Sequence, residues 1–470
     1  MIERQQIFIN GEWTDPSSDD VATVINPATE LPVASIRLGS PADVDQAVAA
    51  ASAALPEWSH TSAEHRAPVL RSLADLIEVR ADEASHMMTT EMGQPITTAL
   101  GTTAGAIQDL RIFADALKDV IWSETVGGAE VHKVAAGVVG VITAWNVPLR
   151  TVAVKIGAAL AAGCTTVLKG SEIAPLTSYL VADLAQQAGI PAGVLNLVPG
   201  TGPVVGEAIA AHPRVDMVSL TGSVRAGSRV MELASRSIKR VGLELGGKSA
   251  NIVLDDADVE KAVSVGIVDA LRNGGQACGG LTRVLVPRPK LGAAEEAAAS
   301  AAASFRLGDP LDPATTMGPM SNKGQRDRVR GYIRTGIDEG ARLVIGGPEQ
   351  PEGLDVGFYV KPTVFTGDNS MRVAREEIFG PVVVLIPFED EAEAVNLAND
   401  SEYGLAGAVW SASPDRARAV ASRIRTGRVV INGAPVERAA PHGGFKRSGI
   451  GREWGRFGIE DYLELQAIHG

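Results

Sequence analysis

The chain is poor in cysteine, in aromatic residues and in long uninterrupted hydrophobic runs. Two cysteines among 470 residues exclude a disulfide scaffold and a zinc site made of cysteine alone, and they favour a reducing, cytoplasmic location. The longest apolar stretch, residues 152–168, is interrupted by Lys155 and Gly163. It is too short for an uncharged membrane span. We therefore expect a buried helix and strand there, and no membrane partner.

Basic residues are also in the minority. The chain has 43 lysines and arginines against 56 aspartates and glutamates, which gives a net charge of −13. A nucleic-acid-binding surface needs positive charge to neutralise phosphates, so we expect no nucleic acid as a partner. Hydrophobic residues make up 45 % and charged residues 21 %, a balance typical of a well-cored globular protein.

Short strand-like runs alternate with helical segments in two regions of the chain. The first region has predicted strands at 138–145, 165–169, 194–198 and 215–220, and predicted helices at 156–162, 175–189, 206–211 and 227–236. The second region has predicted strands at 252–254, 382–387, 408–411 and 429–432, with a helix starting in the acidic segment 255–260. This alternation predicts α/β architecture with doubly wound, mostly parallel sheets, which bind ligands at the carboxyl ends of their strands.

Three glycine patterns are candidates for phosphate binding. Residues 242–249 match the P-loop pattern, but a strand follows them where a P-loop requires a helix. Residues 200–206 resemble a dinucleotide fingerprint with one residue too many, which favours a simple turn. Residues 222–227 follow a strand and open a helix, so they are the better candidate. A further pair, Gly127-Gly128, predicts a β-hairpin within 121–133.

The strongest chemical pattern is a carboxylate and a thiol, each in a glycine-rich turn. Glu244 lies in Leu-Glu-Leu-Gly-Gly-Lys, and Cys278 lies in Asn-Gly-Gly-Gln-Ala-Cys. Cys164 precedes an apolar strand and is expected to be buried. A free thiol is only a few per cent thiolate at neutral pH, so a nucleophilic Cys278 needs a site that stabilises its anion. None of the seven histidines lies in a recognisable Cys–His motif, which disfavours a protease or acyltransferase dyad without excluding it.

With these motifs the chain resembles the aldehyde dehydrogenase superfamily, in its hydrolytic, NAD(P)-dependent branch. The resemblance extends from Phe8 to Tyr462. Its motifs, in the order in which the family has them, are residues 145–148, 168–169, 243–248, 275–278, 376–381 and 443–449. It implies irreversible oxidation of an aldehyde to a carboxylate. Cys278 attacks the aldehyde, Asn146 and the Cys278 backbone N–H hold the oxyanion, and Glu244 activates the water that hydrolyses the thioester.

The resemblance also implies residues for the cofactor and the substrate. The cofactor-binding residues are Trp145, Lys169, Glu172, Gly222, Ser223, Glu377 and Phe379. The carboxylate of Glu172 favours NAD over NADP, because it repels a 2′-phosphate. The substrate tunnel is lined by Val147, Arg150, Val154, Gly279, Val436 and His442. Its small walls favour medium or bulky apolar aldehydes, whereas Arg150 and His442 are candidates for binding an anionic group. No metal is expected.

The family pattern further implies three parts of the chain. A Rossmann-like cofactor domain comprises residues 1–118 and 134–246, and an α/β catalytic domain comprises 247–448. A small β oligomerisation element, residues 119–133 and 449–470, makes a homodimer or homotetramer. Two alternatives stay open. A coenzyme-A-acylating relative is disfavoured by Glu244, and a catalytically silent binding protein is disfavoured by the joint presence of Cys278, Glu244, Asn146 and Lys169.

Overall fold

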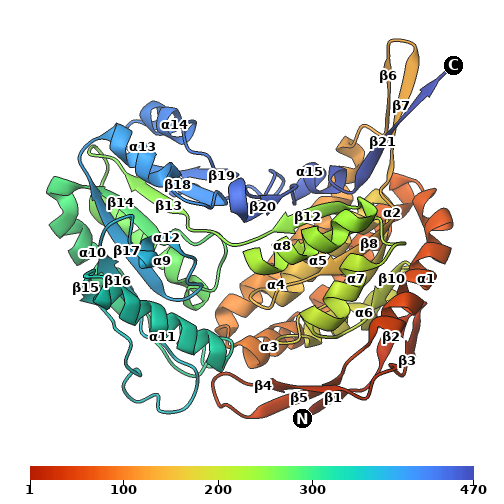
Figure 1. Cartoon of the computed structure of the whole chain (residues 1–470), viewed down its shortest axis with the longest axis horizontal. Helices are drawn as coiled ribbons and strands as arrows, with labels where there is room; N and C mark the ends of the chain where they lie inside the picture. The colour runs from red at the N-terminus through yellow and green to blue at the C-terminus, as the bar shows by residue number, and fades with distance from the viewer.

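Two large, mostly parallel sheets dominate the computed structural model, which describes residues 1–470 (Figure 1). The first sheet runs, in spatial order, through β20 (Gly449–Ile450), β12 (Arg240–Glu244), β11 (Met217–Thr221), β8 (Val138–Ile142), β9 (Thr165–Lys169), β10 (Leu195–Leu197), β2 (Ile7–Ile9) and β3 (Glu12–Thr14). The strands from β12 to β10 are parallel, and the outer ones are antiparallel. The doubly wound α/β architecture expected from the sequence is confirmed.

The second sheet has seven strands, all parallel except the edge strand β15. In spatial order they are β15 (Arg342–Ile345), β16 (Thr363–Thr366), β17 (Val382–Phe388), β14 (Arg283–Pro287), β13 (Ala250–Val253), β18 (Ala406–Trp410) and β19 (Arg428–Ile431). Its helices are α9 (Val259–Leu271), α10 (Leu291–Ala303), α11 (Lys323–Asp338), α12 (Arg372–Arg375), α13 (Glu391–Asn399) and α14 (Pro414–Ala421).

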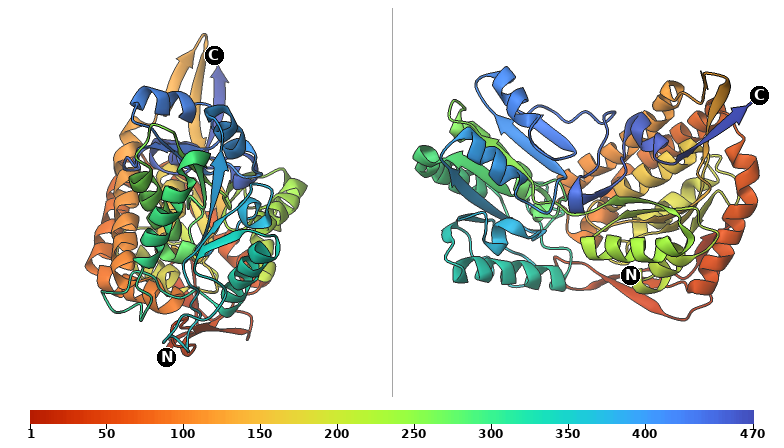
Figure 2. Two further views of the ribbon diagram at one scale, coloured as in Figure 1. Left: turned by 90° about the vertical axis from the view of Figure 1, so that its left-hand side faces the viewer. Right: turned by 45° about the horizontal axis from the view of Figure 1, so that its top comes forward.

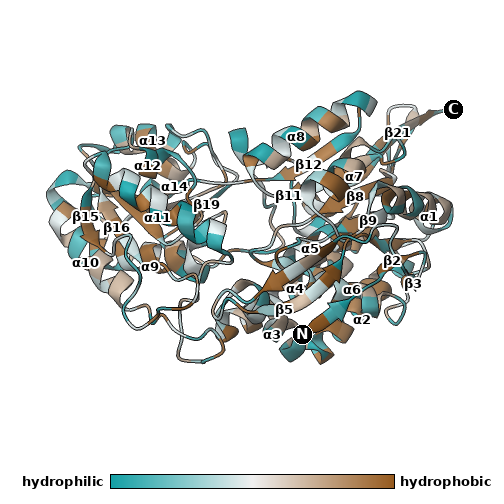
Figure 3. Ribbon diagram, turned by 60° about the horizontal axis from the view of Figure 1, so that its bottom comes forward, coloured by the Kyte–Doolittle hydropathy of each residue, from teal (hydrophilic) through white to brown (hydrophobic).

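Nine helices cover the first sheet and form, together with it, the first lobe of the molecule. They are α1 (Pro41–Ser59), α2 (Ala63–Val79), α3 (Ala81–Met92), α4 (Ile96–Ala116), α5 (Pro148–Ala162), α6 (Leu176–Ala185), α7 (Glu207–Ala211), α8 (Val224–Ala234) and α15 (Gly455–Glu460). Each large sheet has one apolar core on either face. Because the central strands are buried on both faces of each sheet, their sequences are continuous hydrophobic runs (Figure 3). None of the helices combines the length and hydrophobicity needed to cross a membrane.

Several element boundaries differ from the sequence predictions for local reasons. Strand β8 ends at Ile142 rather than at 145, and helix α5 already begins at Pro148, where proline at the first helical position has no N–H to satisfy. Helix α9 begins only at Val259, because Asp258 caps it by accepting from the Lys261 N–H at 3.1 Å. The segment between β8 and α5 is therefore a loop, and this loop carries Asn146.

Two small sheets complete the fold. One contains β1 (Ile2–Arg4), β5 (Pro32–Arg37) and β4 (Val21–Ile25), and the other contains β21 (Leu463–His469), β7 (Ala129–Ala135) and β6 (Ser123–Val126). The β6–β7 hairpin projects from the first lobe together with the C-terminal strand (Figures 1 and 2). The family pattern groups residues 449–470 with this hairpin, whereas in the structure β20 pairs with β12 and α15 packs on α4 and α5. Only β21 extends the hairpin.

Candidate active site

The chemical residues predicted from the sequence cluster at the carboxyl ends of the first sheet. Glu244 is the last residue of β12, Asn146 lies in the loop after β8, and Lys169 ends β9. These strands are parallel, so their ends meet at one edge of the sheet. Asn146 and Glu244 are both 6 % exposed. The alternation of strands and helices therefore brings residues far apart in sequence to a common, mostly buried site.

The cysteine loop begins with a tight left-handed turn after α9. Asn273, Gly274 and Gly275 have φ angles of 56°, 64° and 69°, a conformation that costs a non-glycine residue about 1–3 kcal/mol. A side chain at Gly275 would collide with the carbonyl oxygen of Gly380. The turn leaves Cys278 partly exposed, whereas Cys164 is buried as expected. Cys278 is therefore the accessible thiol of the chain.

Asn146 is bonded directly to this loop. Its Nδ2 donates to the Gln276 carbonyl at 3.0 Å, and Asn273 Nδ2 donates to the Asn146 carbonyl at 3.1 Å. Gln276 is 1 % exposed and is held by a bond from its Nε2 to Asn273 O and by one from the Ser321 N–H to its Oε1. The Asn146 amide thus lies beside the cysteine loop and keeps a second N–H for a ligand.

Glu244 lies in a pocket shared with His442. Neither carboxylate oxygen accepts a hydrogen bond, although His442 Nε2 lies 3.3 Å from Oε2, an ion-pair distance. The His442 ring stacks on Trp454 with 4.3 Å between centroids. Burial disfavours the charged ring, but the attraction of Glu244 outweighs it and, together with Cys278, raises the pKa of His442 to about 9. His442 thus joins Glu244 to the ring of Trp454.

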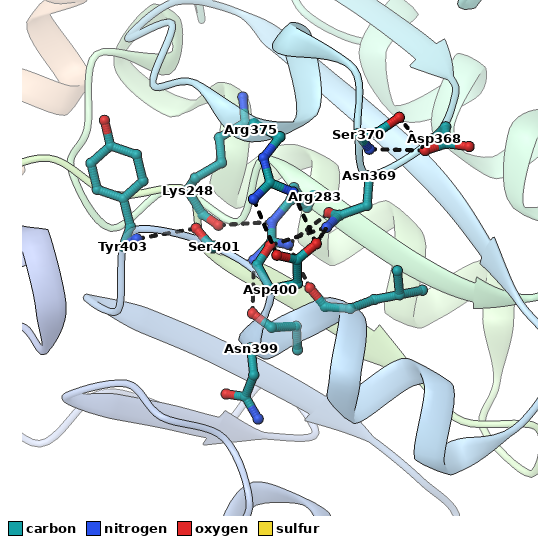
Figure 4. Close-up of polar contacts among 12 residues, drawn as sticks. Lys248, Arg283, Asp368, Asn369, Ser370, Arg375, Asn399, Asp400, Ser401 and Tyr403 are labelled. Atoms are coloured by element: carbon teal, nitrogen blue, oxygen red, sulfur yellow. Dashed lines mark hydrogen bonds and ion pairs between the residues drawn. The ribbon is translucent and has the colours of Figure 1, made fainter.

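Behind Glu244, the glycine-rich turn is held by buried polar contacts. The Gly247 N–H donates to Glu377 Oε1 at 3.0 Å, and burial raises the pKa of Glu377. Arg283 donates from Nε to the Lys248 carbonyl at 2.9 Å and from Nη1 to Asn369 Oδ1 at 2.9 Å (Figure 4). The Lys248 ammonium is buried without a partner, and burial is the main cause that lowers its pKa to about 7. These contacts fix the turn that carries Glu244.

The predicted cofactor residues lie along the same edge of the first sheet. Lys169 Nζ pairs with Glu172 Oε2 at 2.7 Å. Burial by itself would raise the pKa of the Glu172 carboxyl. The attraction of Lys169 and the hydrogen bonds to Glu172 outweigh burial, so the pKa is lowered. Gly222 precedes α8, and the exposed Ser223 caps that helix by accepting from the Ala226 N–H at 3.2 Å. An ammonium, a carboxylate and a helix N-terminus provide donors and acceptors for ribose hydroxyls and a pyrophosphate.

Two aromatic residues face each other near Glu377. The rings of Trp145 and Phe379 meet edge to face, 5.4 Å apart at 88°. Phe379 has a φ of 59°, which is rare for a residue with a bulky side chain. This backbone conformation sets the direction in which the ring points. Gly246 must lack a side chain because the Glu377 carboxylate occupies that space. The donor set and the shaped aromatic wall together fit a nicotinamide dinucleotide.

The predicted tunnel residues have different environments. Arg150 Nε pairs with the buried Asp109 at 2.7 Å, and Arg438 Nη1 lies 3.2 Å from the same carboxylate. Arg150 is therefore engaged within the protein, by an acid that it shares with Arg438. Val154 is 4 % exposed, whereas Val436 is 40 % exposed in the loop after β19. Val147, just before α5, is half-buried. Arg150 is therefore held by an internal ion pair rather than free to bind a substrate anion.

Arg428 at the start of β19 is a site residue that could not be selected from the sequence. A side chain on Gly279 would place its first carbon 3.2 Å from Arg428 Nη2, so the guanidinium occupies the space beside this glycine. Arg428 Nε is buried without a partner, and the guanidinium lies 6.0 Å from the ring centre of Trp454. No motif marks Arg428, since its role depends on the packing of β19 against the cysteine loop.

Comparisons with known proteins agree with this geometry. The model of the aldehyde dehydrogenase family matches residues 13–468. A 3-succinoylsemialdehyde-pyridine dehydrogenase from a Pseudomonas species is 47 % identical over 100 % of this chain and 99 % of its own. A crystal structure of mutant aldehyde dehydrogenase C from Pseudomonas syringae, in complex with NAD+ and octanal, is 47 % identical, with a TM-score of 0.98 over 99 % of this chain and 96 % of that one.

A second solved structure supports the same conclusion. Mycobacterium tuberculosis aldehyde dehydrogenase, complexed with NAD+, is 41 % identical and superposes with a TM-score of 0.96 over 100 % of this chain and 98 % of that one. The family model, a full-length relative and two solved structures thus agree with the resemblance seen in the motifs. This chain belongs to the aldehyde dehydrogenase family.

Proposed function

We propose that this chain oxidises aldehydes to carboxylic acids with NAD as the hydride acceptor. The observation that carries the proposal is the meeting of Cys278, Asn146 and Glu244 at one edge of the first sheet. Burying a carboxylate whose oxygens accept no hydrogen bond costs free energy of folding. Because its lone pairs are unused, however, such a carboxylate can act as a base and accept a proton from a water molecule. Glu244 has these properties beside an accessible thiol.

Each residue has a defined task in this reaction. The Cys278 sulfur attacks the aldehyde carbon, and the Asn146 amide and the Cys278 backbone N–H stabilise the resulting oxyanion. NAD, when bound, would be the acceptor of the hydride that leaves the former aldehyde carbon. The acyl group then remains on Cys278 as a thioester, and Glu244 removes a proton from the water that hydrolyses it. The Glu377 carboxylate and the Phe379 ring are proposed to position the nicotinamide end of the cofactor.

We further propose that the substrates are apolar aldehydes of medium length. Arg150 is engaged by Asp109, and Val147 and Val154 are small apolar walls. Each buried methylene stabilises binding by about 0.8 kcal/mol. The octanal held by aldehyde dehydrogenase C of Pseudomonas syringae supports an apolar chain here.

An aldehyde panel tests both proposals. We expect kcat/KM, measured by NADH absorbance, to rise from two-carbon to eight-carbon aldehydes and to be unaffected by coenzyme A. Dependence on coenzyme A would indicate an acylating enzyme, and no reduction of NAD by any aldehyde would indicate a silent protein. A preference for a semialdehyde acid would contradict the apolar proposal. It would instead indicate Arg428, whose Nε has no partner, as the anion-binding residue.

Cofactor choice depends on Glu172. Its carboxylate lies beside Lys169 at the end of β9, where it can accept from a ribose hydroxyl and repel a 2′-phosphate. We expect wild-type enzyme to have a higher kcat/KM with NAD than with NADP, and Glu172→Gln to reduce this ratio by about 1 to 2 orders of magnitude, since one order corresponds to about 1.4 kcal/mol. An unchanged ratio in Glu172→Gln would show that other residues set the preference.

We propose that the sheet of β21, β7 and β6 joins subunits into a homodimer or homotetramer. Four of its apolar side chains are 40–70 % exposed, namely Val126, Val134, Leu465 and Ile468. An open strand edge with apolar side chains is a surface for pairing with another chain.

We also propose that residues 1–118 and 134–246 form the cofactor domain and that residues 247–448 form the catalytic domain. We propose a cytoplasmic location for the enzyme.

Replacement of Leu465 tests this interface. Leu465 is 70 % exposed on β21, and a charge there would be desolvated in an interface. We expect Leu465→Asp to give a smaller species than wild type by light scattering. The matched control is Val356→Asp, because Val356 is 57 % exposed but lies in a loop outside this sheet. An unchanged mass in Leu465→Asp would exclude β21 as the contact.

A further inference from the structure

Arg428, at the start of β19, places its guanidinium beside the cysteine loop. A first side-chain carbon on Gly279, the residue after Cys278, would lie 3.2 Å from Arg428 Nη2. Since consecutive Cα atoms are about 3.8 Å apart, this nitrogen lies within about 9 Å of the Cα of Cys278. The guanidinium also lies 6.0 Å from the ring centre of Trp454. It is therefore within reach of the chain of a substrate that is bound to the Cys278 sulfur.

Four other cationic side chains on the elements around this loop have acidic partners. They are Arg150 with Asp109 at 2.7 Å, Arg438 with Asp109 at 3.2 Å, Arg272 with Asp269 at 3.5 Å and His442 with Glu244 at 3.3 Å. Arg428 differs from all of them. Its guanidinium forms no hydrogen bond or ion pair with the protein, and its Nε is buried. Arg428 thus keeps its hydrogen-bonding capacity for something other than this chain.

A guanidinium without an acceptor is unfavourable in this position. Arginine carries five N–H donors and stays charged at physiological pH. Burial lowers the pKa of Arg428, which means that the surroundings disfavour the cation. The face of Trp454 compensates only in part, since a cation–π contact leaves the N–H groups without an acceptor. An acceptor that a ligand brings to this guanidinium would therefore be bound favourably.

We propose that Arg428 is a specificity-determining residue, which donates a hydrogen bond to an oxygen atom on the substrate chain, a few carbons from the aldehyde group. The preferred substrates are then apolar aldehydes that carry one oxygen function, such as a ketone, rather than plain alkanals. This inference rests on the proposed function, because it takes Cys278 as the residue to which the acyl group is attached. The small walls at Val147 and Val154 stay available to the rest of the chain.

Steady-state kinetics with aldehydes of equal chain length test the proposal. Octanal is compared with 4-, 5- and 6-oxo-octanal and with the eight-carbon semialdehyde acid, with NADH absorbance as the readout. We expect at least one ketone to exceed octanal in kcat/KM by about 10- to 100-fold, the usual effect of one hydrogen bond to a charged group. The difference should lie in KM, because the bond is present in both the ground state and the transition state.

Three variants show whether Arg428 is the donor. Arg428→Gln removes the charge and should bring the ratio of kcat/KM for the ketone to that for octanal close to one. Arg428→Lys keeps a charged donor and should retain part of the ratio. The matched control is Arg272→Gln, because Arg272 lies at the start of the turn that leads to Cys278 but its side chain is 64 % exposed. It should keep the wild-type ratio.

A wild-type ratio close to one for all three ketones and for the semialdehyde acid would overturn the inference, whether or not the variants fold. An unchanged ratio in Arg428→Gln would also overturn it, because a merely structural arginine would affect all aldehydes alike. A preference for the semialdehyde acid that is lost in Arg428→Gln would keep Arg428 as the donor, with a carboxylate as its acceptor, and would overturn the apolar substrate class. Failure of the proposed function would be seen separately, as no NADH from any aldehyde.

Discussion

Glu244→Gln should complete the oxidation of one aldehyde per active site and then stop. Glutamine has the shape of glutamate but cannot take a proton from water, so the acyl group should remain on Cys278 as a thioester. The loss of a general base lowers a rate by about 10²–10⁴-fold. Glu244 is buried at the end of β12 and its oxygens accept no hydrogen bond. His442 Nε2 lies 3.3 Å from Oε2, so Oε1 remains available to the substrate water.

Rapid mixing with an aldehyde and NAD measures this effect. We expect a burst of up to one NADH per site, followed by a steady rate far below that of wild type, and an acylated Cys278 by mass spectrometry. Cys278→Ala is the control and should give neither burst nor turnover. Native steady-state turnover in Glu244→Gln would require another base for thioester hydrolysis.

The features that could be predicted from the sequence are those set by local patterns. Strand β9 has the predicted bounds, Thr165–Lys169, because a continuous β-branched and apolar run is buried on both faces. The hairpin turn at Gly127-Gly128 follows from the left-handed φ of 61° that Gly127 adopts. The turns that carry Glu244 and Cys278 were likewise visible as glycine clusters. Each of these depends on neighbours within a few residues.

The features that could not be predicted depend on tertiary contacts. Arg150 is a candidate for binding an anionic group in the sequence, but its partner Asp109 lies on α4, 41 residues away. His442 lies in no recognisable Cys–His motif and is predicted only as a tunnel residue, yet it reaches Glu244 because its backbone pairs with Glu453. Arg428 belongs to a strand with no motif. Since charge pairing and burial decide what these side chains do, no local pattern could assign them.

Asn146→Ala should reduce kcat by about 10²–10³-fold, the usual cost of removing one oxyanion donor. The amide is buried beside the cysteine loop, where its Nδ2 donates to the Gln276 carbonyl at 3.0 Å. In the alanine variant this carbonyl still has a donor, because Asn273 Nδ2 lies 3.4 Å from it. The loop should therefore keep its conformation, and the loss should come from the reaction of Cys278.

Two measurements separate these effects. If Asn146 acts on the oxyanion, Asn146→Ala should alkylate at Cys278 with the wild-type pH profile, because the thiolate itself is unaffected, while its burst of NADH becomes slow. The control is Asn196→Ala, since Asn196 is also buried but donates to Thr166 and Gly193 in the first sheet; it should lose stability rather than kcat. A burst at the wild-type rate in Asn146→Ala would leave the Cys278 backbone N–H as the sole donor to the oxyanion.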